Sequence, residues 1–227
     1  KPAGVDVVLC GTSADDDVSA TNIELDQNGS PVFDLMFANG AQFKTKLGIT
    51  GKQAVPNALY AAAVASELGI PQFTIDEVFR EAQITGHRQE VRLAANGARV
   101  IDDSYNASPE SMAAGLDLLS TLPCRGARVA ILGEMGELGD EAPRLHQLVG
   151  AYAASKKPGL LICVGDENAR QMASAARLMG MDEDSIQVVT DCDKLIARYS
   201  HVLAPTDLVL VKGSRFVGLD RFVEEVC

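Results

Sequence analysis

The chain has 227 residues, of which 47% are hydrophobic and 22% are charged. These fractions are typical of a globular protein, so they exclude an intrinsically disordered chain. Lys and Arg number 20 against 31 Asp and Glu, which gives a formal net charge of −11. Nucleic acids and anionic membranes bind basic surfaces, so we expect neither of them as a partner.

Short apolar runs and scattered cysteines exclude further classes. The longest apolar runs, near residues 59–64 and 208–211, fall far below the ~20 residues of a membrane-spanning helix. The five cysteines are odd in number and widely spaced, which predicts reduced thiols in a cytoplasmic protein. Neither the cysteines nor the three histidines form a ligand cluster, so no metal site is predicted. A strand-like run follows the first residue, Lys1, almost at once, so we expect a piece of a longer protein.

The first third of the chain predicts strands followed by helices. Turn-forming residues separate short runs rich in β-branched and aromatic residues. Within one run, Phe33, Leu35 and Phe37 alternate as in a half-buried antiparallel ribbon. An Ala-rich helix should end at Gly69, and a second helix should begin after Thr74. The predicted strands are 5–10, 18–25, 32–37 and 42–49, and the predicted helices are 57–68 and 75–82.

The remainder of the chain changes character after Gly86. Asn96-Gly97 predicts a hairpin turn, and helices then alternate with strands that are apolar throughout. Such strands are typical of a parallel sheet that is covered on both faces. The predicted strands are 91–94, 99–103, 128–132, 160–164, 186–189 and 208–211, and the predicted helices are 109–122, 143–155, 169–179, 195–203 and 219–226. The expected fold is α/β, with a doubly wound, mostly parallel sheet that follows a strand-rich and helical segment.

Two of these helices allow predictions for single residues. Ser108 should be the N-cap of the helix 109–122, with Pro109 at its first position. In the helix 143–155, an apolar stripe that includes Leu145, Leu148 and Val149 should face the core.

Polar and flexible residues follow the predicted parallel strands, where ligands bind in folds of this kind. A dinucleotide site is a weak interpretation. Gly133, Gly136 and Gly139 are spaced G-x-x-G-x-x-G and are interleaved with glutamates, whereas the dinucleotide motif is G-x-G-x-x-G.

A phosphoacceptor receiver domain, which would signal without catalysing a reaction, is the alternative interpretation. It requires an acidic pair, a phosphorylated aspartate, a hydroxyl residue and a lysine at neighbouring strand ends. Asp102, Asp103, Asp166, Thr190 and Lys212 fall at suitable places in the sequence. Against it, Asp166 comes after the glycine that ends its strand, and a glycine follows Lys212 where a receiver has proline.

A third interpretation comes from longer motifs. The segment VIDDSYNASPESM at 100–112 closely resembles a signature of the Mur ligases, most of all the branch that adds D-alanyl-D-alanine to a UDP-muramoyl tripeptide. The segments AILGEMGELG at 130–139, HQLVG at 146–150 and LVKGSR at 210–215 resemble further motifs in the same order. Upstream, NAL at 57–59 and AAA at 61–63 resemble a helix of the family's central ATPase domain.

The resemblance implies a domain assignment and a reaction. Residues 1–86 would be the last portion of a central ATP-binding domain, and residues 87–227 would be a complete C-terminal, Rossmann-like domain. The family's phosphate loop is absent, because Gly51-Lys52 has neither an upstream glycine loop nor a following hydroxyl residue. The intact enzyme would use ATP and Mg²⁺ to join the UDP-muramoyl tripeptide to D-alanyl-D-alanine in peptidoglycan precursor synthesis. The chain alone should fold but should not ligate.

The resemblance also suggests ATP contacts. Asp103 matches an aspartate that binds the ribose hydroxyls, and Arg88 matches an interdomain arginine that contacts the nucleotide. Asn57 matches an asparagine near the adenine, although Gln53 and Ala54 replace two residues of that motif. The alternatives are a capping role for Asp103, a solvated linker position for Arg88 and a helix N-cap role for Asn57.

A second group of residues should face the dipeptide. A Gly-Ser turn offers amides and a hydroxyl, and an arginine offers a bidentate fork for a carboxylate. Arg215 could alternatively pair with Glu134 or Glu137. The residues of this group are Lys212, Ser214 and Arg215 on one loop and Tyr105 and Asn106 on a facing loop. We expect Asp102 to fix its loop, and His146 to bond the 133–139 loop in a structural role.

Overall fold

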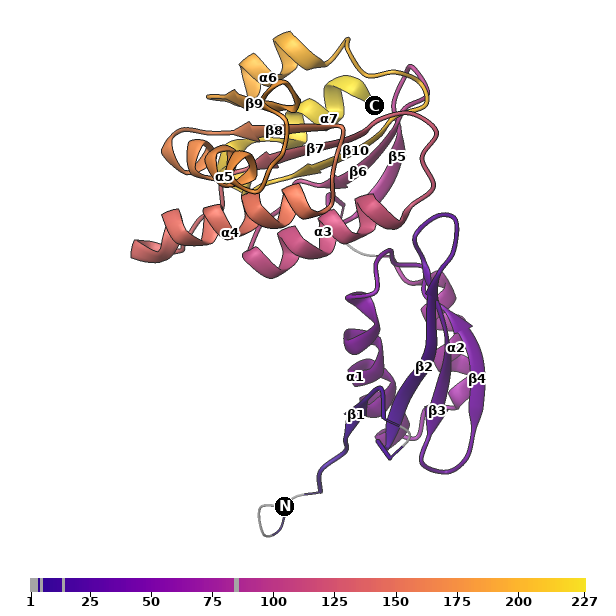
Figure 1. The fold of residues 1–227 in the computed structure, drawn as a ribbon. Coiled ribbons are helices and arrows are strands. Elements are labelled where there is room, and N and C mark those ends of the chain that lie inside the picture. The colour runs from indigo at the N-terminus through magenta and orange to yellow at the C-terminus, as the bar shows by residue number, and fades with distance from the viewer. Residues whose placement is uncertain (1–3, 5, 14, 84–85) are drawn as a thin grey trace. The chain divides into compact units, whose positions relative to one another are not determined.

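The computed structural model describes residues 4, 6–13, 15–83 and 86–227. The chain divides into two compact units, Lys1–Ile84 and Thr85–Cys227, which Figure 1 shows in indigo to purple and in magenta to yellow. Within the described ranges, no helix is both long enough and apolar enough to cross a lipid bilayer.

The first unit is a sheet with two helices. The strand order is β1-β2-β3-β4; β1 pairs with β2 in parallel, and the other pairs are antiparallel. The side chains of β3 alternate in burial, with Phe33, Leu35 and Phe37 inward as predicted. They pack against Leu59 of the first helix and Phe79 of the second in one apolar cluster. The elements are β1 (Cys10–Gly11), β2 (Val18–Leu25), β3 (Pro31–Phe37), β4 (Gln42–Lys46), α1 (Ala54–Glu67) and α2 (Gln72–Glu81).

Both helices of this unit begin three residues before the predicted position. Helix α1 has Gln53 as its N-cap, and it ends before Gly69, whose φ of +75° suits a helix terminus. Helix α2 has Pro71 as its N-cap, and the Pro71 carbonyl accepts hydrogen bonds from the amides of Thr74 and Ile75. The prediction that Thr74 caps this helix is therefore wrong. The predicted strand 5–10 reduces to its last residue among the described ones.

The second unit is a doubly wound sheet with the order β5-β6-β10-β7-β8-β9, which confirms the predicted α/β class. Strand β5 is antiparallel to β6, and the remaining strands pair in parallel. The strands are β5 (Glu90–Leu93), β6 (Arg99–Asp103), β7 (Arg128–Gly133), β8 (Leu160–Val164), β9 (Ile186–Val189) and β10 (Leu208–Lys212). The helices are α3 (Pro109–Thr121), α4 (Ala142–Ser155), α5 (Glu167–Leu178), α6 (Cys192–Tyr199) and α7 (Asp220–Val226), with short 3₁₀ turns η1 (Gly139–Glu141), η2 (Glu183–Ser185) and η3 (Arg215–Val217).

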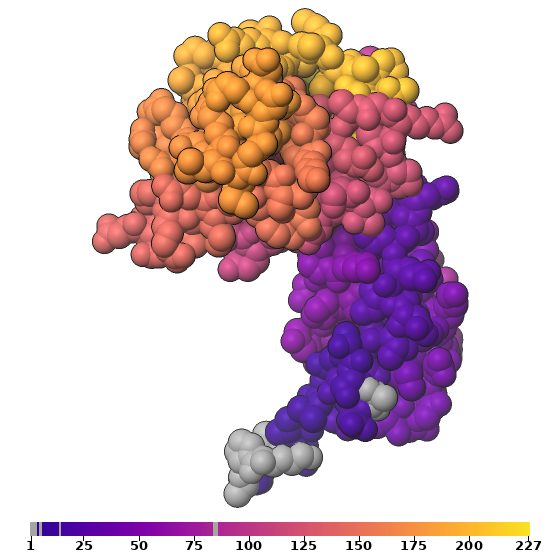
Figure 2. Space-filling model, viewed as in Figure 1, coloured from indigo at the N-terminus to yellow at the C-terminus, as the bar shows by residue number. Residues whose placement is uncertain are grey.

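Helices cover both faces of this sheet, as the apolar strands predict. Helices α3, α4 and α5 lie on one face, and α6 and α7 lie on the other (Figure 1). On the α6 and α7 face, Leu195 and Phe222 pack with strand residues such as Ile131 and Val209 in a cluster from which water is excluded. The segments that contain α6 and α7 are neighbours at the surface, in orange and yellow in Figure 2.

Local predictions for two helices had different outcomes. Ser108 caps α3 as predicted, in a reciprocal arrangement with Ser111, and Pro109 is the first helical residue. In α4 the predicted stripe holds for Val149, which is buried, but it is wrong for Leu148, which is 55% exposed; the buried face instead adds His146 and Gly150. A Cβ on Gly150 would lie 2.1 Å from the Met172 carbonyl oxygen of α5. The two helices therefore meet at the glycine, and this contact turns Leu148 toward water.

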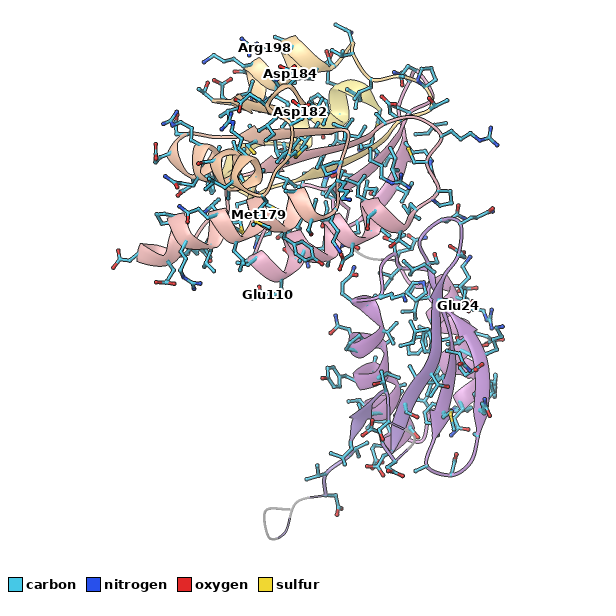
Figure 3. The ribbon with its side chains drawn as sticks, viewed as in Figure 1. Glu24, Glu110, Met179, Asp182, Asp184 and Arg198 are labelled. Carbon is cyan, nitrogen blue, oxygen red and sulfur yellow. The ribbon has the colours of Figure 1, made fainter. Side chains whose placement is uncertain are left out.

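The acidic excess lies on the surface. Figure 3 labels Glu24, Glu110, Asp182 and Asp184, and all four are exposed. Arg198 of α6, also labelled there, is an exposed basic residue of the second unit.

Candidate functional site at the carboxyl edge of the second sheet

Three neighbouring strands bring their following loops together. Strand β10 lies between β6 and β7, and Lys212 pairs in register with Asp103 on one side and Leu132 on the other. Because the three strands are parallel, the loops that follow them emerge at the same edge of the sheet. In doubly wound folds this edge carries the ligand. Most of the residues that the sequence assigns to a site lie here.

A buried ion pair forms the floor of this edge. Asp103 is 6% exposed and Lys212 is 1% exposed, and Nζ of Lys212 lies 2.8 Å from Oδ2 of Asp103. The same ammonium group donates a hydrogen bond of 2.9 Å to the carbonyl oxygen of Asn106. Gly115 of α3 leaves room for the lysine stem, since a Cβ there would lie 3.3 Å from Lys212 Cδ. Lys212 therefore joins the loop after β6 to the end of β10.

The electrostatics of Asp103 reflect its burial. Burial raises the pKa of the Asp103 carboxyl, and Lys212 and hydrogen bonds from Gln89 oppose the rise only in part. Its Oδ2 atom faces the lysine without the alignment of a hydrogen bond and has no other acceptor contact among the described residues. This oxygen is buried beside the lysine ammonium.

Ser214 connects the loops of the other two strands. Its hydroxyl accepts a hydrogen bond of 2.8 Å from the Gly136 amide, and its amide donates one of 3.0 Å to the Glu134 carbonyl. The hydroxyl also lies 3.4 Å from Oδ1 of Asn106, at the limit of a hydrogen bond. The 133–139 loop is held from its other side by His146, whose Nε2 accepts a 2.8 Å hydrogen bond from the Met135 amide. The predicted structural role of His146 is thereby confirmed.

The strand ends also approach each other directly. A Cβ on Gly213 would lie 3.0 Å from the Cα of Gly133, so a side chain there would force the neighbouring backbone to shift. Glycine at both positions lets the two loops touch at the backbone.

Asp102 fixes the loop after β6, as expected from the sequence. It is fully buried, and its Oδ1 accepts hydrogen bonds from the Ser104 amide and hydroxyl. Its Oδ2 lies 2.8 Å from Nδ1 of His87 and 3.7 Å from the Arg92 guanidinium. The amide of Tyr105 in turn donates a hydrogen bond of 3.1 Å to the His87 carbonyl.

The segment around Arg88 is therefore part of the site. Arg88 lies over the ring of Tyr105, with the guanidinium carbon 4.5 Å from the ring centroid. Gln89, which hydrogen-bonds Asp103, is 5% exposed. The sequence interpretation missed His87 and Gln89, and the only signal for them is their place beside Arg88.

Arg215 lies on the rim. It is exposed at the first position of η3, and it has no ion pair or side-chain hydrogen bond with any residue that the structure describes. The alternative partner Glu134 is engaged elsewhere, because its Oε1 accepts hydrogen bonds from the amides of Asp166 and Ala169. Phe216 beside it is 68% exposed and lies against Gly136.

Asn57 belongs to the first unit, whereas the site residues described above belong to the second. It is exposed in the first turns of α1, and because Gln53 is the N-cap, the alternative role of Asn57 as N-cap is wrong.

The residues required by a receiver domain do not converge. Only Asp103 and Lys212 touch, whereas β7 lies between β10 and the strand before Asp166, and β7 and β8 lie between β10 and the strand before Thr190. The Thr190 hydroxyl bonds Asp191 and accepts from Lys194.

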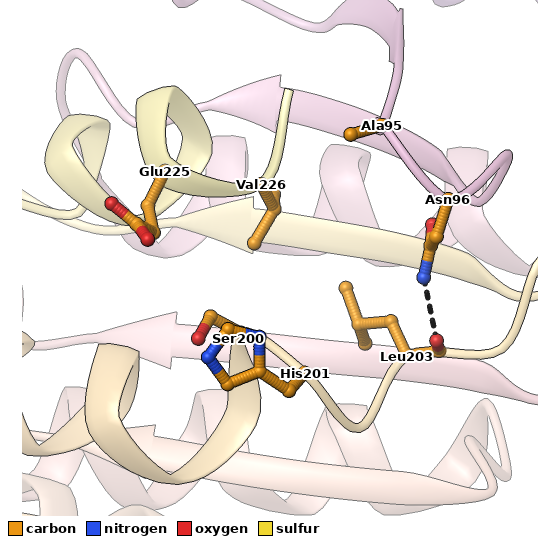
Figure 4. A pocket seen from close by; sticks show the side chains of 7 residues that line it. All are labelled: Ala95, Asn96, Ser200, His201, Leu203, Glu225 and Val226. Atoms are coloured by element: carbon orange, nitrogen blue, oxygen red, sulfur yellow. Dashed lines mark hydrogen bonds between the residues drawn. The ribbon is translucent and has the colours of Figure 1, made fainter.

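A concavity lies at the opposite, amino edge of this sheet (Figure 4). The turn between β5 and β6, the segment after α6 and the end of α7 line it. Asn96 crosses its rim by donating a hydrogen bond of 2.6 Å to the Leu203 carbonyl, while His201 and Glu225 supply further polar atoms. None of the residues that the sequence assigns to a site lies in it.

Residues 87–215, more than half of the chain, match the family model described as "Mur ligase, glutamate ligase domain". The chain belongs to the Mur ligase family. The match contains the three loops, Arg88 and Arg215, and it confirms the resemblance stated from the motifs.

The relatives that the chain matches within the Mur ligase family share one name. The chain is 35% identical over 221 residues to the UDP-N-acetylmuramoyl-tripeptide–D-alanyl-D-alanine ligase of Mycobacterium tuberculosis H37Rv, covering 89% of the chain and 43% of the relative. It is 30% identical to the ligase of that name from Escherichia coli K12, covering 93% of the chain and 44% of the relative. A crystal structure of MurF from Acinetobacter baumannii superposes with a TM-score of 0.78 at 28% identity, covering 94% of the chain and 45% of that structure. The chain thus spans less than half the length of these relatives.

Proposed function

We propose that this chain is the carboxyl-terminal part of a cytoplasmic, ATP-dependent Mur ligase that adds D-alanyl-D-alanine to a UDP-muramoyl tripeptide. One structural observation carries the proposal for the site. Around the buried Asp103–Lys212 pair, the carboxyl edge of an acidic chain presents two arginines, Arg88 and Arg215, that have no ion pair among the described residues. Both substrates that such a domain would hold carry an anionic group, the phosphates of a nucleotide and the carboxylate of a dipeptide.

Within the second unit, the nucleotide is assigned to Arg88 and Asp103. The Asp103 carboxylate stands at the end of β6, where it would accept hydrogen bonds from vicinal ribose hydroxyls as strand-end carboxylates do in dinucleotide folds. Arg88 supplies a guanidinium for a phosphate group. Asn57, exposed on α1 of the first unit, would lie near the adenine; residues 1–86 are proposed to be the last portion of a central ATP-binding domain.

The dipeptide side is assigned to the loop after β10. Arg215 would hold the dipeptide carboxylate in a bidentate manner, with Ser214 and Asn106 beside it. Lys212 is buried beneath the loop, and it would set the position of Asn106 through the carbonyl contact. The ring of Tyr105 is occupied by Arg88, so we do not place it against the dipeptide.

In this reaction the γ-phosphoryl group of ATP passes to the terminal carboxylate of the tripeptide, and ADP leaves. The dipeptide amine then bonds to the acyl carbon, the phosphate leaves with its bonding electrons, and the amine loses a proton. The residues above would contribute positioning and charge complementarity. Mg²⁺ supplies charge neutralisation at the phosphates when bound. Among the described residues, no cluster of three or more His, Cys, Asp or Glu is arranged to hold a metal ion, so we assign no ligand for it here.

The decisive experiment uses the complete ligase that contains this chain. Arg215→Ala should raise KM for D-alanyl-D-alanine by about tenfold or more, because a charged hydrogen bond is lost, and should leave KM for ATP unchanged. Arg198→Ala, which removes an exposed arginine of α6 in the same unit, is the matched control. Unchanged kinetics in Arg215→Ala would remove this assignment. The 227-residue chain alone should form no pentapeptide, since it has no Gly-Lys-Thr or Gly-Lys-Ser phosphate loop.

A further inference from the structure

The Arg88 side chain is supported on one side and unpaired on the other. Its guanidinium carbon lies over the face of the Tyr105 ring, and the guanidinium has no hydrogen bond or ion pair with any residue that the structure describes. Both residues are exposed, Tyr105 by 40%. An arginine stacked on an aromatic ring loses freedom of rotation but keeps its N–H groups for an anion.

The backbone on both sides of this stack is fixed by buried groups. His87 directly precedes Arg88, and its imidazole Nδ1 lies 2.8 Å from the fully buried Asp102 carboxylate. The His87 carbonyl accepts the amide hydrogen of Tyr105, so the two segments that carry the stack are joined at the backbone. Gln89 directly follows Arg88 and is buried against Asp103.

The backbone of this segment has positive φ angles, which residues other than glycine rarely adopt. His87 has a φ of +64° and Gln89 has a φ of +50°. Such conformations have a free-energy cost and persist only where surrounding contacts determine them. Here the contacts are those of His87 with Asp102 and of Gln89 with Asp103. The position of Arg88 is therefore imposed by its neighbours.

We propose that Tyr105 and His87 are positioning residues that hold the Arg88 guanidinium at the carboxyl edge, with its N–H groups free for a phosphate of the bound nucleotide. The inference rests on the proposed function for the identity of the ligand. It gives Tyr105 a role different from the dipeptide contact that the sequence suggests. It adds His87, which no sequence motif singled out.

The first test is a double-mutant cycle in the complete ligase. Tyr105→Ala should raise KM for ATP about threefold to fivefold, the size of an exposed cation–π contact, and should leave KM for the dipeptide unchanged. Tyr105→Phe keeps the ring and should behave as the wild type. In an Arg88→Ala background, Tyr105→Ala should have no further effect, because the residue acts through Arg88. Equal damage by Tyr105→Phe and Tyr105→Ala, or full multiplication of the two effects, would overturn the proposal.

The second test separates the His87 side chain from its backbone conformation. Glycine adopts a positive φ without strain, so His87→Gly keeps the backbone conformation accessible and removes only the contact with Asp102. We expect His87→Gly and His87→Ala to raise KM for ATP by similar factors. A neutral His87→Gly would show that the imidazole contact is dispensable.

A third measurement needs no catalysis and uses the 227-residue chain itself. The ring current of Tyr105 should shift the NMR signals of the Arg88 side-chain protons, and the shift should vanish in Tyr105→Ala, remain in Tyr105→Phe and weaken in His87→Gly. If the complete enzyme formed no pentapeptide while these shifts were present, the proposed function would fail and the stack would stand. If ligation occurred but Tyr105→Ala left KM for ATP unchanged, the positioning role would fail and the function would stand.

Discussion

The inner and outer strand ends of the second unit carry similar residues but organise them differently. At the ends of β6, β10 and β7, polar groups form hydrogen bonds from one loop to another. Lys212 bonds Asn106 across a sequence separation of 106 residues, and Gly136 bonds Ser214 across a separation of 78 residues. At the end of β9, Thr190, Asp191 and Lys194 are bonded to one another within four positions, near the surface.

The difference shows which strand ends can hold a ligand rigidly. The outer group stabilises only the start of α6, where Asp191 is the N-cap. The inner group fixes three loops relative to one another, so that side chains on different loops keep a common geometry. Breaking a contact of the inner group should therefore cost far more than breaking one of the outer group.

The largest effect is expected for Lys212→Met. The substitution removes the ammonium group and leaves the Asp103 carboxyl buried without its partner, which should lower the free energy of unfolding by about 3–5 kcal/mol. Urea unfolding at neutral pH measures it. Lys194→Met, which breaks the outer group, is the control and should not change the midpoint measurably. If Lys212→Met shifted the urea midpoint no more than Lys194→Met does, the difference between the inner and outer strand ends would be refuted. The double variant Lys212→Met with Asp103→Asn should recover part of the loss, because no buried charge remains.

A smaller loss is expected for Ser214→Ala. The Gly136 amide loses its acceptor in a partly buried position, which should cost about 1 kcal/mol. The matched substitution at the outer strand end is Thr190→Ala, whose hydroxyl is exposed, and it should be close to neutral. Thermal unfolding of the two variants side by side measures the difference, and equal shifts in Tm would contradict it.

The smallest effect is a difference in the sign of the pH dependence. Burial raises the pKa of Asp103, so the native state binds this proton more tightly than the unfolded chain does. The stabilisation from Asp103 is therefore full below the ordinary pKa of 3.8 and is lost as the pH rises above it. For Asp191, the Thr190 hydroxyl and the Lys194 amide and ammonium hold the pKa at about 2, so its stabilisation is present above 3.8 and is lost as the pH falls toward 2.

This contrast is measured by chemical unfolding of the wild type, Asp103→Asn and Asp191→Asn across the acid range. The free energy of unfolding of the wild type minus that of Asp103→Asn should fall as the pH rises above about 3.8. The free energy of unfolding of the wild type minus that of Asp191→Asn should rise as the pH increases from about 2 to 3.8. Two differences of the same sign would contradict the assignment.

Local signals in the sequence were sufficient for most elements of the second unit. Solid apolar strands predicted the parallel sheet, and Ser108-Pro109 located the start of α3. Asp103, Lys212, Ser214 and Asn106 could be grouped because parallel strands end at one edge. These predictions depend on spacing and on residue type, which a sequence states directly.

The failures arose where tertiary contacts override spacing. The inward face of α4 is set by the contact of Gly150 with the α5 backbone, which no count of apolar residues reveals. His87 and Gln89 adopt positive φ because of buried partners 15 and 14 positions away. Their residue types gave no reason to expect that conformation.

The backbone contact between Gly133 and Gly213 limits how the loops at the carboxyl edge can be altered. A Cβ at either position would lie within 3.2 Å of the other glycine's Cα, so a side chain there would strain the bases of both loops while the strands stay paired. Variation has to come from the residues that follow each glycine, such as Met135 and Gly136 on one loop and Arg215 and Phe216 on the other. A library of variants of this edge would keep the glycines fixed and randomise those outer positions together, because Phe216 already lies against Gly136.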